Sequence, residues 1–210
     1  MTKLFSIGYA GRSPKGLLSI LSHFNVELLI DVRSNPYSKV NPEYNGVAFS
    51  RFLKEHGLKY ADLGELLGAR PESKSLYDRQ SGAADYQRIS QSAPFQKGIN
   101  NLIAALNNGI NAALICAERN PETCHRSLLI GDYLQTNFHI EMEHIISADK
   151  LLNQRELVHD LVYRDTSGNI DLFSDFEQLK SEALDRQIKK YAYVNPTYKQ
   201  EKLKIQRNRR

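Results

Sequence analysis

The chain has 210 residues, of which 41% are apolar and 25% charged, the size and composition of one globular domain. No apolar run approaches the roughly 18 residues of a membrane helix, and the first residues do not resemble a signal peptide. The two cysteines, Cys116 and Cys124, are too few for a disulfide framework. We therefore expect a cytoplasmic location, in a reducing compartment and away from membranes.

In chain order, the first half is predicted to alternate strands and helices. We expect a strand at 3–7, a helix from Pro14, a buried strand at 26–32, a loop at 34–45, a helix at 47–56 and a short strand at 58–63. Ser13 and Pro14 are typical of a helix N-cap and first turn. A long polar loop is predicted at 64–82.

The second half continues this alternation as far as residue 145. We expect a helix at 85–107, broken near Pro94, a buried strand at 112–116, a helix at 120–135 and a half-buried strand at 138–145. A helix or helix pair is predicted at 173–193. The fold class is therefore α/β: a mainly parallel sheet with helices on both faces and a helical C-terminal extension from about residue 150.

Charge divides the chain into a mildly acidic body and a basic end. Residues 186–210 hold nine Lys or Arg and one acidic residue, a net charge of +8, so the other 185 residues must carry −4 to give the total of +4. We expect one domain over 1–195 and a basic, flexible tail over 196–210. The segment 186–210 either binds nucleic acid, with Tyr191, Tyr193 and Tyr198 stacking on bases, or is a solvated helix end.

Three predicted strand ends are unusually polar: residues 8–13, 31–38 and 116–126. Ligands of open α/β sheets bind beyond the carboxyl ends of the strands. If these strands are parallel neighbours, the three segments converge on one crevice. Arg70, Tyr77 and Arg79 would reach over it if the 64–82 loop folds back; the alternative is a mobile surface loop.

The third segment carries the most chemistry. Cys116 ends a strand just before a predicted helix N-terminus, whose field would lower the pKa of a thiol and hold an anion. Cys116 is then the candidate nucleophile, with His125 or Asp31 as acid or base. Cys124 is a second thiol able to resolve an oxidised or persulfidated Cys116.

An anion would be bound by further polar residues of the three segments. These candidates are Arg12, Arg33, Tyr37, Arg119, Cys124 and Arg126.

Each of these residues also has a structural interpretation. Cys116 and Cys124 can be interpreted as small apolar residues of the core, and His125 as a side chain that only hydrogen-bonds a loop carbonyl. Asp31 is a base, a hydroxyl acceptor or simply the partner of an arginine. A zinc site from the two cysteines and His125 lacks a C-x-x-C or H-x-x-H pair and a clear fourth ligand, so neither a metal nor a cofactor is predicted.

The stretches SIGYAGRS, LLIDVRSNPYSKVNPEYN and LICAERNPETCHRSLL resemble the domain of unknown function 488 family. Its members pair an "IGHS" start with a "DVRS-P-S" motif and a "C-E-(x)-P-x-x-C-H-R" motif. The stretch LFSDFEQLKSEALDRQIKKYAY is similar to the family's C-terminal helix, so the resemblance covers most of 1–195. The chain departs from the family at Tyr9, where many members have His. The resemblance implies a fold and no settled activity.

A weaker resemblance, to rhodanese-like proteins, rests on LLIDVRSNP preceding LICAERNP. In those proteins an Asp-Val-Arg strand end precedes a strand that ends in a loop with cysteine and arginine. Only the stretch from Cys116 to Arg119 approximates that loop here. This is an analogy between folds.

Three functions fit these features. The first is an enzyme acting on a small anionic or nucleotide-like substrate at the crevice. The second is a non-catalytic module that binds a small anionic ligand there. The third is a nucleic-acid-associated protein that uses its basic C-terminal end. The sequence does not predict an oligomeric state.

Overall fold

A six-stranded sheet organises the computed structural model, which describes residues 2–168 and 175–198. The strands are β1 Leu4–Gly8, β2 Leu28–Asp31, β3 Lys59–Asp62, β4 Ala112–Cys116, β5 Met142–Ser147 and β6 Lys150–Asn153. Their spatial order is β3-β2-β4-β1-β5-β6. All pairs are parallel except β5 with β6, which is antiparallel. The predicted α/β class with a mainly parallel sheet is confirmed.

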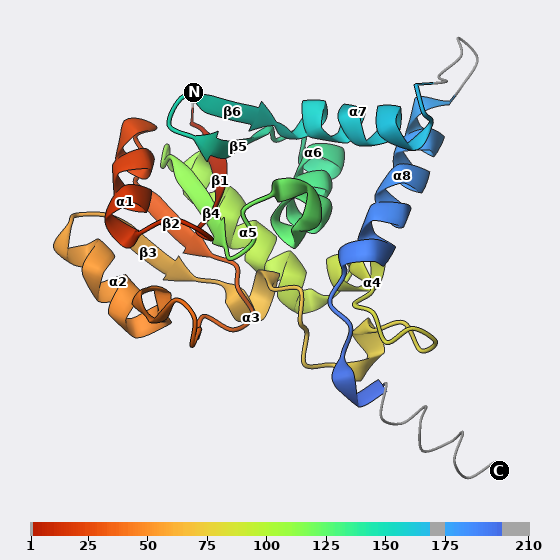
Figure 1. Cartoon of the computed structure of the whole chain (residues 1–210), viewed down its shortest axis with the longest axis horizontal. Coiled ribbons are helices and arrows are strands. Elements are labelled where there is room, and N and C mark those ends of the chain that lie inside the picture. Colours follow the sequence, from red (N-terminus) through yellow and green to blue (C-terminus); the bar gives the residue numbers. More distant parts are fainter. Residues whose placement is uncertain (1, 169–174, 199–210) are drawn as a thin grey trace.

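Helices cover both faces of this sheet (Figure 1). They are α1 Pro14–His23, α2 Gly46–Glu55, α3 Gly64–Leu67, α4 Tyr86–Ser90, α5 Ala93–Asn107, α6 Asp132–Phe138, α7 Gln154–Asp165 and α8 Phe176–Tyr191. Shorter turns are the 3₁₀ segments η1 Pro42–Tyr44, η2 Lys74–Leu76 and η3 Pro121–Thr123 and the π-helical segment η4 Arg126–Gly131. Within the described ranges, no helix has the length and apolar character that crossing a membrane requires.

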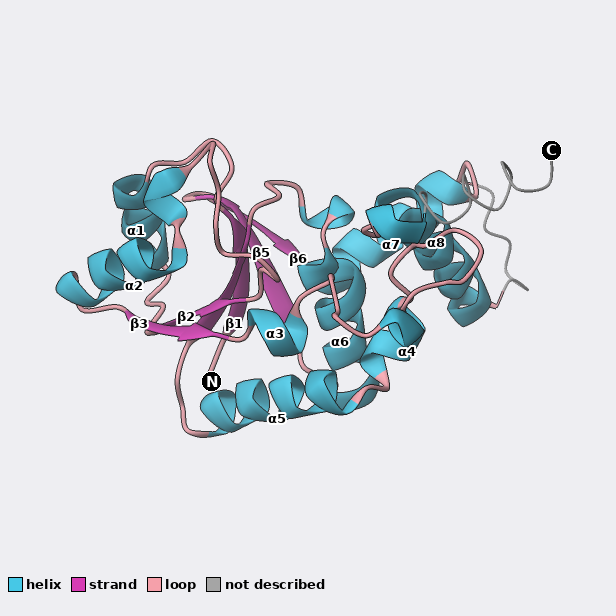
Figure 2. Cartoon of the chain, turned by 90° about the horizontal axis from the view of Figure 1, so that it is seen from below, coloured by secondary structure: helices cyan, strands magenta, loops and turns pink. Residues whose placement is uncertain are grey.

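The alternation of side chains along the strands divides the core in two. Phe5, Ile7 and Ile115 point toward α1 and α2, where they join Leu17 and Phe49. The other face carries the second cluster, which α3, α5, α6 and α7 complete with residues such as Leu67, Phe95, Leu134 and Leu157. Figure 2 shows α1 and α2 on one side of the strands and α3, α5 and α6 on the other. Burial on both faces explains why the central strands read as continuous apolar runs.

Local signals place the helix starts. The Ser13 hydroxyl accepts from the Gly16 amide at 3.2 Å, and Pro14 is the first residue of α1. The Ser92 side chain caps α5, which has its proline in the first turn, so the predicted break near Pro94 is confirmed. Such a cap stabilises a helix by about 1 kcal/mol.

The helix predicted from residue 120 starts later than expected. Residues 121–123 form only a 3₁₀ turn, Cys124 is extended, and the helix begins at Arg126 with the π-helical segment η4. The Arg126 guanidinium holds the carbonyls of Glu118 and Arg119, so the chain before it is drawn into a loop over the sheet edge. A local sequence pattern cannot show that tertiary constraint.

Further boundaries differ from the predictions. Helix α6 continues through Phe138, so β5 begins at Met142, not at 138. The C-terminal extension starts with strand β6, which sequence patterning missed because its four residues pair only through the β5–β6 hairpin. The 64–82 loop contains α3 and η2. Residues 173 and 174 of the expected last helix lie outside the described residues.

Candidate functional site

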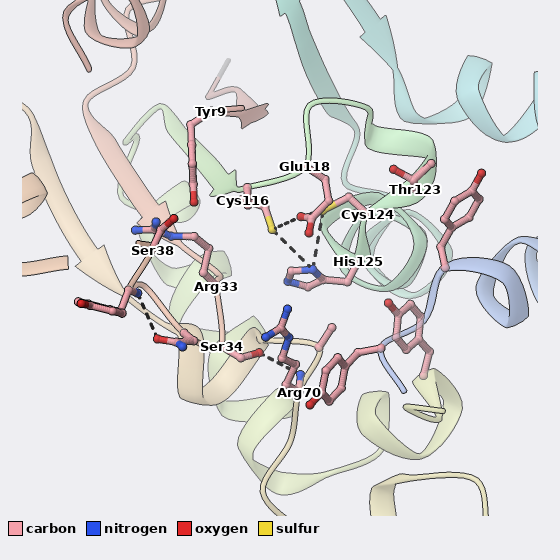
Figure 3. A pocket seen from close by; sticks show the side chains of 17 residues that line it. Tyr9, Arg33, Ser34, Ser38, Arg70, Cys116, Glu118, Thr123, Cys124 and His125 are labelled. Carbon is pink, nitrogen blue, oxygen red and sulfur yellow. Dashed lines mark hydrogen bonds between the residues drawn. The ribbon is translucent and has the colours of Figure 1, made fainter. Parts of the chain in front are cut away.

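A pocket of about 360 Å³ lies beyond the carboxyl ends of β1, β2 and β4, which are neighbours in the sheet. Among the described residues it is lined by Tyr9, Arg33, Ser34, Asn35, Tyr37, Ser38, Ala69, Arg70, Tyr86, Cys116, Ala117, Glu118, Thr123, Cys124, His125, Tyr191 and Tyr193. All three polar strand ends therefore contribute to one site, as the parallel arrangement predicted. Figure 3 shows Cys116, Glu118 and Cys124 converging near His125.

His125 lies against both cysteines. Its Nδ1 is 3.9 Å from Cys116 Sγ and 3.8 Å from Cys124 Sγ, and its Nε2 is 2.9 Å from the Val32 carbonyl oxygen. Because a carbonyl only accepts, Nε2 carries a proton, and Nδ1 faces the two sulfurs. The structure thus brings together three of the predicted site residues.

Glu118 completes this group of side chains. Its Oε2 accepts from the Cys116 thiol at 2.7 Å and from the Cys124 thiol at 3.3 Å. Both cysteines are free and buried, on the pocket's inner side. Two thiols, an imidazole and a carboxylate can together bind a metal ion, transfer protons or supply a nucleophile.

The surrounding charges shift the pKa values of the two thiols in opposite directions. The Cys124 sulfur, burial and the Glu118 carboxylate raise the pKa of Cys116 well above that of a free thiol. Burial also raises the pKa of Cys124, but Cys116 and the positive charges of Arg126 and His125 outweigh burial and lower it well below the ordinary value. The expected lowering of the Cys116 pKa is therefore wrong, because the positive field acts on Cys124.

The imidazole responds to the same charges. Burial lowers the pKa of His125, but the neighbouring Cys124 thiolate and the Glu118 carboxylate raise it above the ordinary histidine value. Burial raises the pKa of Tyr86, and the two cysteines and Glu118 raise it further. The Tyr86 hydroxyl therefore stays protonated beside this group.

Asp31 is the partner of Arg33. Arg33 Nε donates to both Asp31 oxygens at 2.9 and 3.0 Å, and Nη2 donates to Oδ2 at 2.5 Å. Tyr60 donates to the same Oδ2 at 2.8 Å. Asp31 is fully buried and absent from the pocket lining, and its contacts are those of the arginine-partner alternative; its catalytic role stays a prediction.

Arg33 lines the pocket next to Tyr9. Its guanidinium lies 5.1 Å from the Tyr9 ring centre, and Nη2 also donates to the Tyr44 carbonyl. The side chain is only 4% exposed, yet Nη1 has no hydrogen-bond partner among the described residues. A ligand oxygen within reach of Nη1 would accept from its hydrogens.

Three other predicted anion-binding arginines lie outside the pocket lining. Arg12 donates to the carbonyls of Gly8 and Ile146, which ties the β1 loop to β5. Arg126 is buried and donates to Ser6 Oγ and to the carbonyls of Glu118 and Arg119. Arg119 is exposed. Arg12 and Arg126 are held by backbone carbonyls, so an anion clamp built from them is not formed.

Segments far apart in the sequence close the pocket. Arg70 lines it, and its guanidinium lies 4.6 Å from the ring centre of Tyr193, at the C-terminal end. Its backbone amide donates to Ser34 Oγ at 2.9 Å. Of the three residues expected to reach the crevice from the 64–82 segment, Arg70 does so, whereas Tyr77 and Arg79 are absent from the pocket lining. Tyr37 also lines the pocket but is 62% exposed.

The tyrosines assigned to a nucleic-acid-binding tail pack on the domain instead. Tyr191 and Tyr193 line the pocket, and the Tyr198 hydroxyl donates to the Lys74 carbonyl at 2.9 Å. Residues 199–210 of the predicted tail lie outside the described residues. Nucleic-acid binding through 186–210 stays a prediction.

Sequence reasoning missed several lining residues. Glu118 was detectable, because it follows the strand-ending Cys116 by two positions inside the third motif. Tyr86 gave no signal of a site, and Tyr191 and Tyr193 were assigned to nucleic-acid binding, because only the fold places these segments at the sheet edge.

The comparisons with known proteins identify the family. The family model described as domain of unknown function DUF488 matches residues 13–134, more than half of the chain. No curated protein and no solved structure matches the chain. The comparisons lend no support to the resemblance to rhodanese-like proteins. The matched region includes the second and third motifs, whose residues line the pocket. The chain therefore belongs to the DUF488 family.

Proposed function

We propose that this protein is an enzyme that acts on a small anionic or nucleotide-like substrate bound in the pocket. The anion binds between Arg33 and Arg70, and the reaction takes place at the group formed by Cys116, Glu118, Cys124 and His125. The observation that carries the proposal is the buried guanidinium of Arg33, a residue that lines the pocket and whose Nη1 has no hydrogen-bond partner among the described residues.

An unmade hydrogen bond at a buried donor costs about 1–3 kcal/mol. Asp31 and Tyr44 satisfy the other side of the Arg33 guanidinium, so the Nη1 face is rigid and preorganised. An oxyanion of the substrate would satisfy it. Arg70 adds a second, solvent-accessible positive charge, held above the Tyr193 ring.

The dimensions suit a small molecule. A volume of about 360 Å³ lies at the small end of the roughly 300–1,000 Å³ range of ligand pockets. Five lining residues are tyrosines, which supply flat faces and hydroxyl groups to an aromatic or sugar-like ligand: Tyr9, Tyr37, Tyr86, Tyr191 and Tyr193.

The acidic side of the pocket favours catalysis over simple anion binding. Glu118 and the two thiols lie in the same pocket as Arg33. A site selected only to hold an anion would exclude a carboxylate, because like charges repel. A carboxylate beside thiols and an imidazole is useful when protons must move.

Phosphate binding tests the substrate-binding half of the proposal. We expect inorganic phosphate to bind the wild-type chain in isothermal titration calorimetry, and Arg70→Gln to weaken it roughly tenfold, since a hydrogen bond to a charged group contributes about 1.5–3 kcal/mol. Arg79→Gln is the matched control, because Arg79 is an exposed arginine of the same segment that does not line the pocket. Equal affinity in wild type and Arg70→Gln would contradict the anion site.

Turnover separates the enzyme from the binding module. The wild-type chain would be incubated with a panel of nucleoside monophosphates and sugar phosphates, with product detection by mass spectrometry. We expect Glu118→Gln to lose conversion and keep phosphate binding. Phosphate binding by the wild type without conversion of any panel member would favour the non-catalytic module.

A further inference from the structure

Cys116, Cys124 and His125 place one ligand atom each within 4.8 Å of one another, and all three residues are buried. We propose that these three residues bind a single Zn²⁺ ion, which is the reactive centre of the pocket. The inference deepens the proposed function and rests on it for the identity of the substrate as an anion.

The spacing of the three atoms fits this ion. Zinc bonds of about 2.3 Å to sulfur and about 2.0–2.1 Å to nitrogen at tetrahedral angles separate the two ligand atoms by about 3.5 Å. The distances from His125 Nδ1 to the sulfurs are 3.9 and 3.8 Å. Shifts of a few tenths of an ångström, roughly, would bring His125 Nδ1 and each sulfur to this separation, and the two sulfurs lie within 4.8 Å of each other.

The orientation of the imidazole is that of a metal ligand. A zinc-bound histidine usually donates its other ring N–H to a carboxylate or a backbone carbonyl, which sets the tautomer. His125 does so to Val32 O at 2.9 Å, so Nδ1, the nitrogen that faces the sulfurs, is the one that a metal would occupy in place of a proton. Val32 follows β2 directly, and its own amide is bonded to the Ile115 carbonyl, so this contact is rigid.

The charge around the three ligands calls for a cation. The Glu118 carboxylate lies 2.7 and 3.3 Å from the two sulfurs, so three acidic groups gather at one place. In the described parts of the chain, Glu118 has no ion pair, and the nearby Arg126 guanidinium is directed to Ser6 and to two backbone carbonyls. A divalent cation would offset the charge of two thiolates.

The sequence offers no clear fourth protein ligand, which argued against a structural zinc site. Catalytic zinc sites, however, have only three protein ligands and keep one position for water or substrate, whereas structural sites are closed by four. All three ligands line the pocket, which can supply that water, and Glu118 is beside them to exchange a proton with it. The ion would act as a Lewis acid on the bound anion.

Metal analysis of the full chain tests this proposal. The protein is purified from zinc-supplemented medium and kept reduced without a chelating thiol. We expect about one zinc per chain, measured by inductively coupled plasma mass spectrometry. Cys116→Ser, Cys124→Ser and His125→Gln should each bring the zinc content close to zero. His23→Gln is the matched control: an exposed histidine of α1 whose loss should leave the zinc content unchanged.

Because buried substitutions can prevent folding, the unaltered chain is also titrated with Co²⁺. We expect a thiolate-to-cobalt charge-transfer band and intense visible bands of a tetrahedral ion, saturating at about one cobalt per chain and abolished by added Zn²⁺. Zinc should also slow alkylation of both cysteines at least roughly tenfold. Absence of the thiolate band, or alkylation at the same rate with and without zinc, would overturn the zinc site.

The same protein preparations distinguish failure of the zinc proposal from failure of the proposed function. Phosphate binding that depends on Arg70 in a chain that binds no metal would remove the zinc and keep the anion site. Stoichiometric zinc in a chain whose phosphate affinity is indifferent to Arg70→Gln would keep the metal and remove the anion site.

Discussion

The Asp31–Arg33 ion pair contributes both to the packing of the core and to the wall of the pocket. Asp31 is fully buried and Arg33 nearly so, and Tyr60 donates to the same carboxylate. The pair is therefore fixed in place: Asp31 orients the guanidinium, whose Nη1 has no hydrogen-bond partner among the described residues. Removal of either partner would leave an uncompensated charge in the interior.

We expect Arg33→Met to lower the free energy of unfolding by about 3–5 kcal/mol, because Asp31 would remain buried without its partner. Urea unfolding followed by circular dichroism measures this change. The double variant Asp31→Leu with Arg33→Met should be less destabilised than the sum of the two single variants, since it buries no lone charge. A loss below about 1 kcal/mol in Arg33→Met would show that water reaches Asp31.

His144 makes the stability depend on pH. It lies between Ser6 and Gln154, with Ser6 Oγ at 2.6 Å from Nδ1 and Gln154 Oε1 at 2.8 Å from Nε2. Burial and the Arg126 charge lower its pKa to about 4. An unfolded histidine has a pKa of about 6.5, so between these values the unfolded chain binds a proton that the folded chain does not.

The resulting stability is fully present above about pH 6.5 and is lost as the pH falls toward 4. The shift corresponds to at most about 3 kcal/mol. Urea unfolding at pH 7, 5.5 and 4.5 should show this loss in the wild type and a smaller one in His144→Gln, whose side chain does not titrate. Identical pH profiles of the two proteins would mean that His144 is protonated without cost in the folded state.

At the scale of elements, the loop after β4 is shaped by its contact with β1. A Cβ atom at Gly8 would lie 1.9 Å from the Glu118 carbonyl oxygen and 2.7 Å from Arg119 Cα, so only glycine permits this crossing. The Arg126 guanidinium holds the same two residues by their carbonyls. The loop is thereby pressed onto the sheet edge with Glu118 beside the thiols.

We expect Gly8→Ala to lower stability by about 1–3 kcal/mol, the usual effect of overpacking, and to weaken metal and phosphate binding by displacing Glu118. Thermal unfolding and calorimetry measure the two effects. Gly16→Ala is the comparison, because it lies in helix α1 with Ser13 Oγ as its nearest contact, at 3.3 Å. Binding in Gly8→Ala equal to that in Gly16→Ala would show that the loop adapts without moving Glu118.

At the scale of the whole molecule, the C-terminal segment completes the pocket. The Ala84 amide donates to the Tyr193 carbonyl at 2.8 Å and the Asn195 amide to the Gly82 carbonyl at 2.9 Å. Tyr191 and Tyr193 thereby become part of the pocket wall, and Tyr193 lies beside Arg70. The pocket is therefore lined by residues from both ends of the sequence.

Two shortened chains test this dependence. A chain ending at residue 198 is expected to bind phosphate as the full chain does, whereas one ending at residue 190 should bind it roughly tenfold more weakly or not at all, because Arg70 loses its aromatic support. Calorimetry measures both affinities. Full affinity in the chain ending at 190 would remove the C-terminal segment from the site.

The chain ending at 198 also tests the basic end. If residues beyond 198 bind nucleic acid, the full chain should bind an oligonucleotide with strong salt dependence and the shortened chain should not. Equal binding by the two chains would contradict a role for residues 199–210.

The sequence by itself determined the fold class and the sheet edge at which the pocket lies. Apolar runs such as 26–32 and 112–116 are local signals of strands buried on both faces, and their polar ends had to meet at one edge once the strands were parallel. Cys116, Cys124 and His125 were identified because they follow such a strand in one short motif.

Only the tertiary structure decided what each charged side chain does. The partners of Arg12 and Arg126 are backbone carbonyls of other segments. Because every residue has a backbone carbonyl, the sequence does not indicate which one an arginine will contact. The two thiols differ in pKa because Arg126 and His125 act on Cys124, which depends on distances between side chains and not on their order. Tyr193 and Arg70 are more than a hundred residues apart, so their contact, and with it one wall of the pocket, exists only in the folded chain.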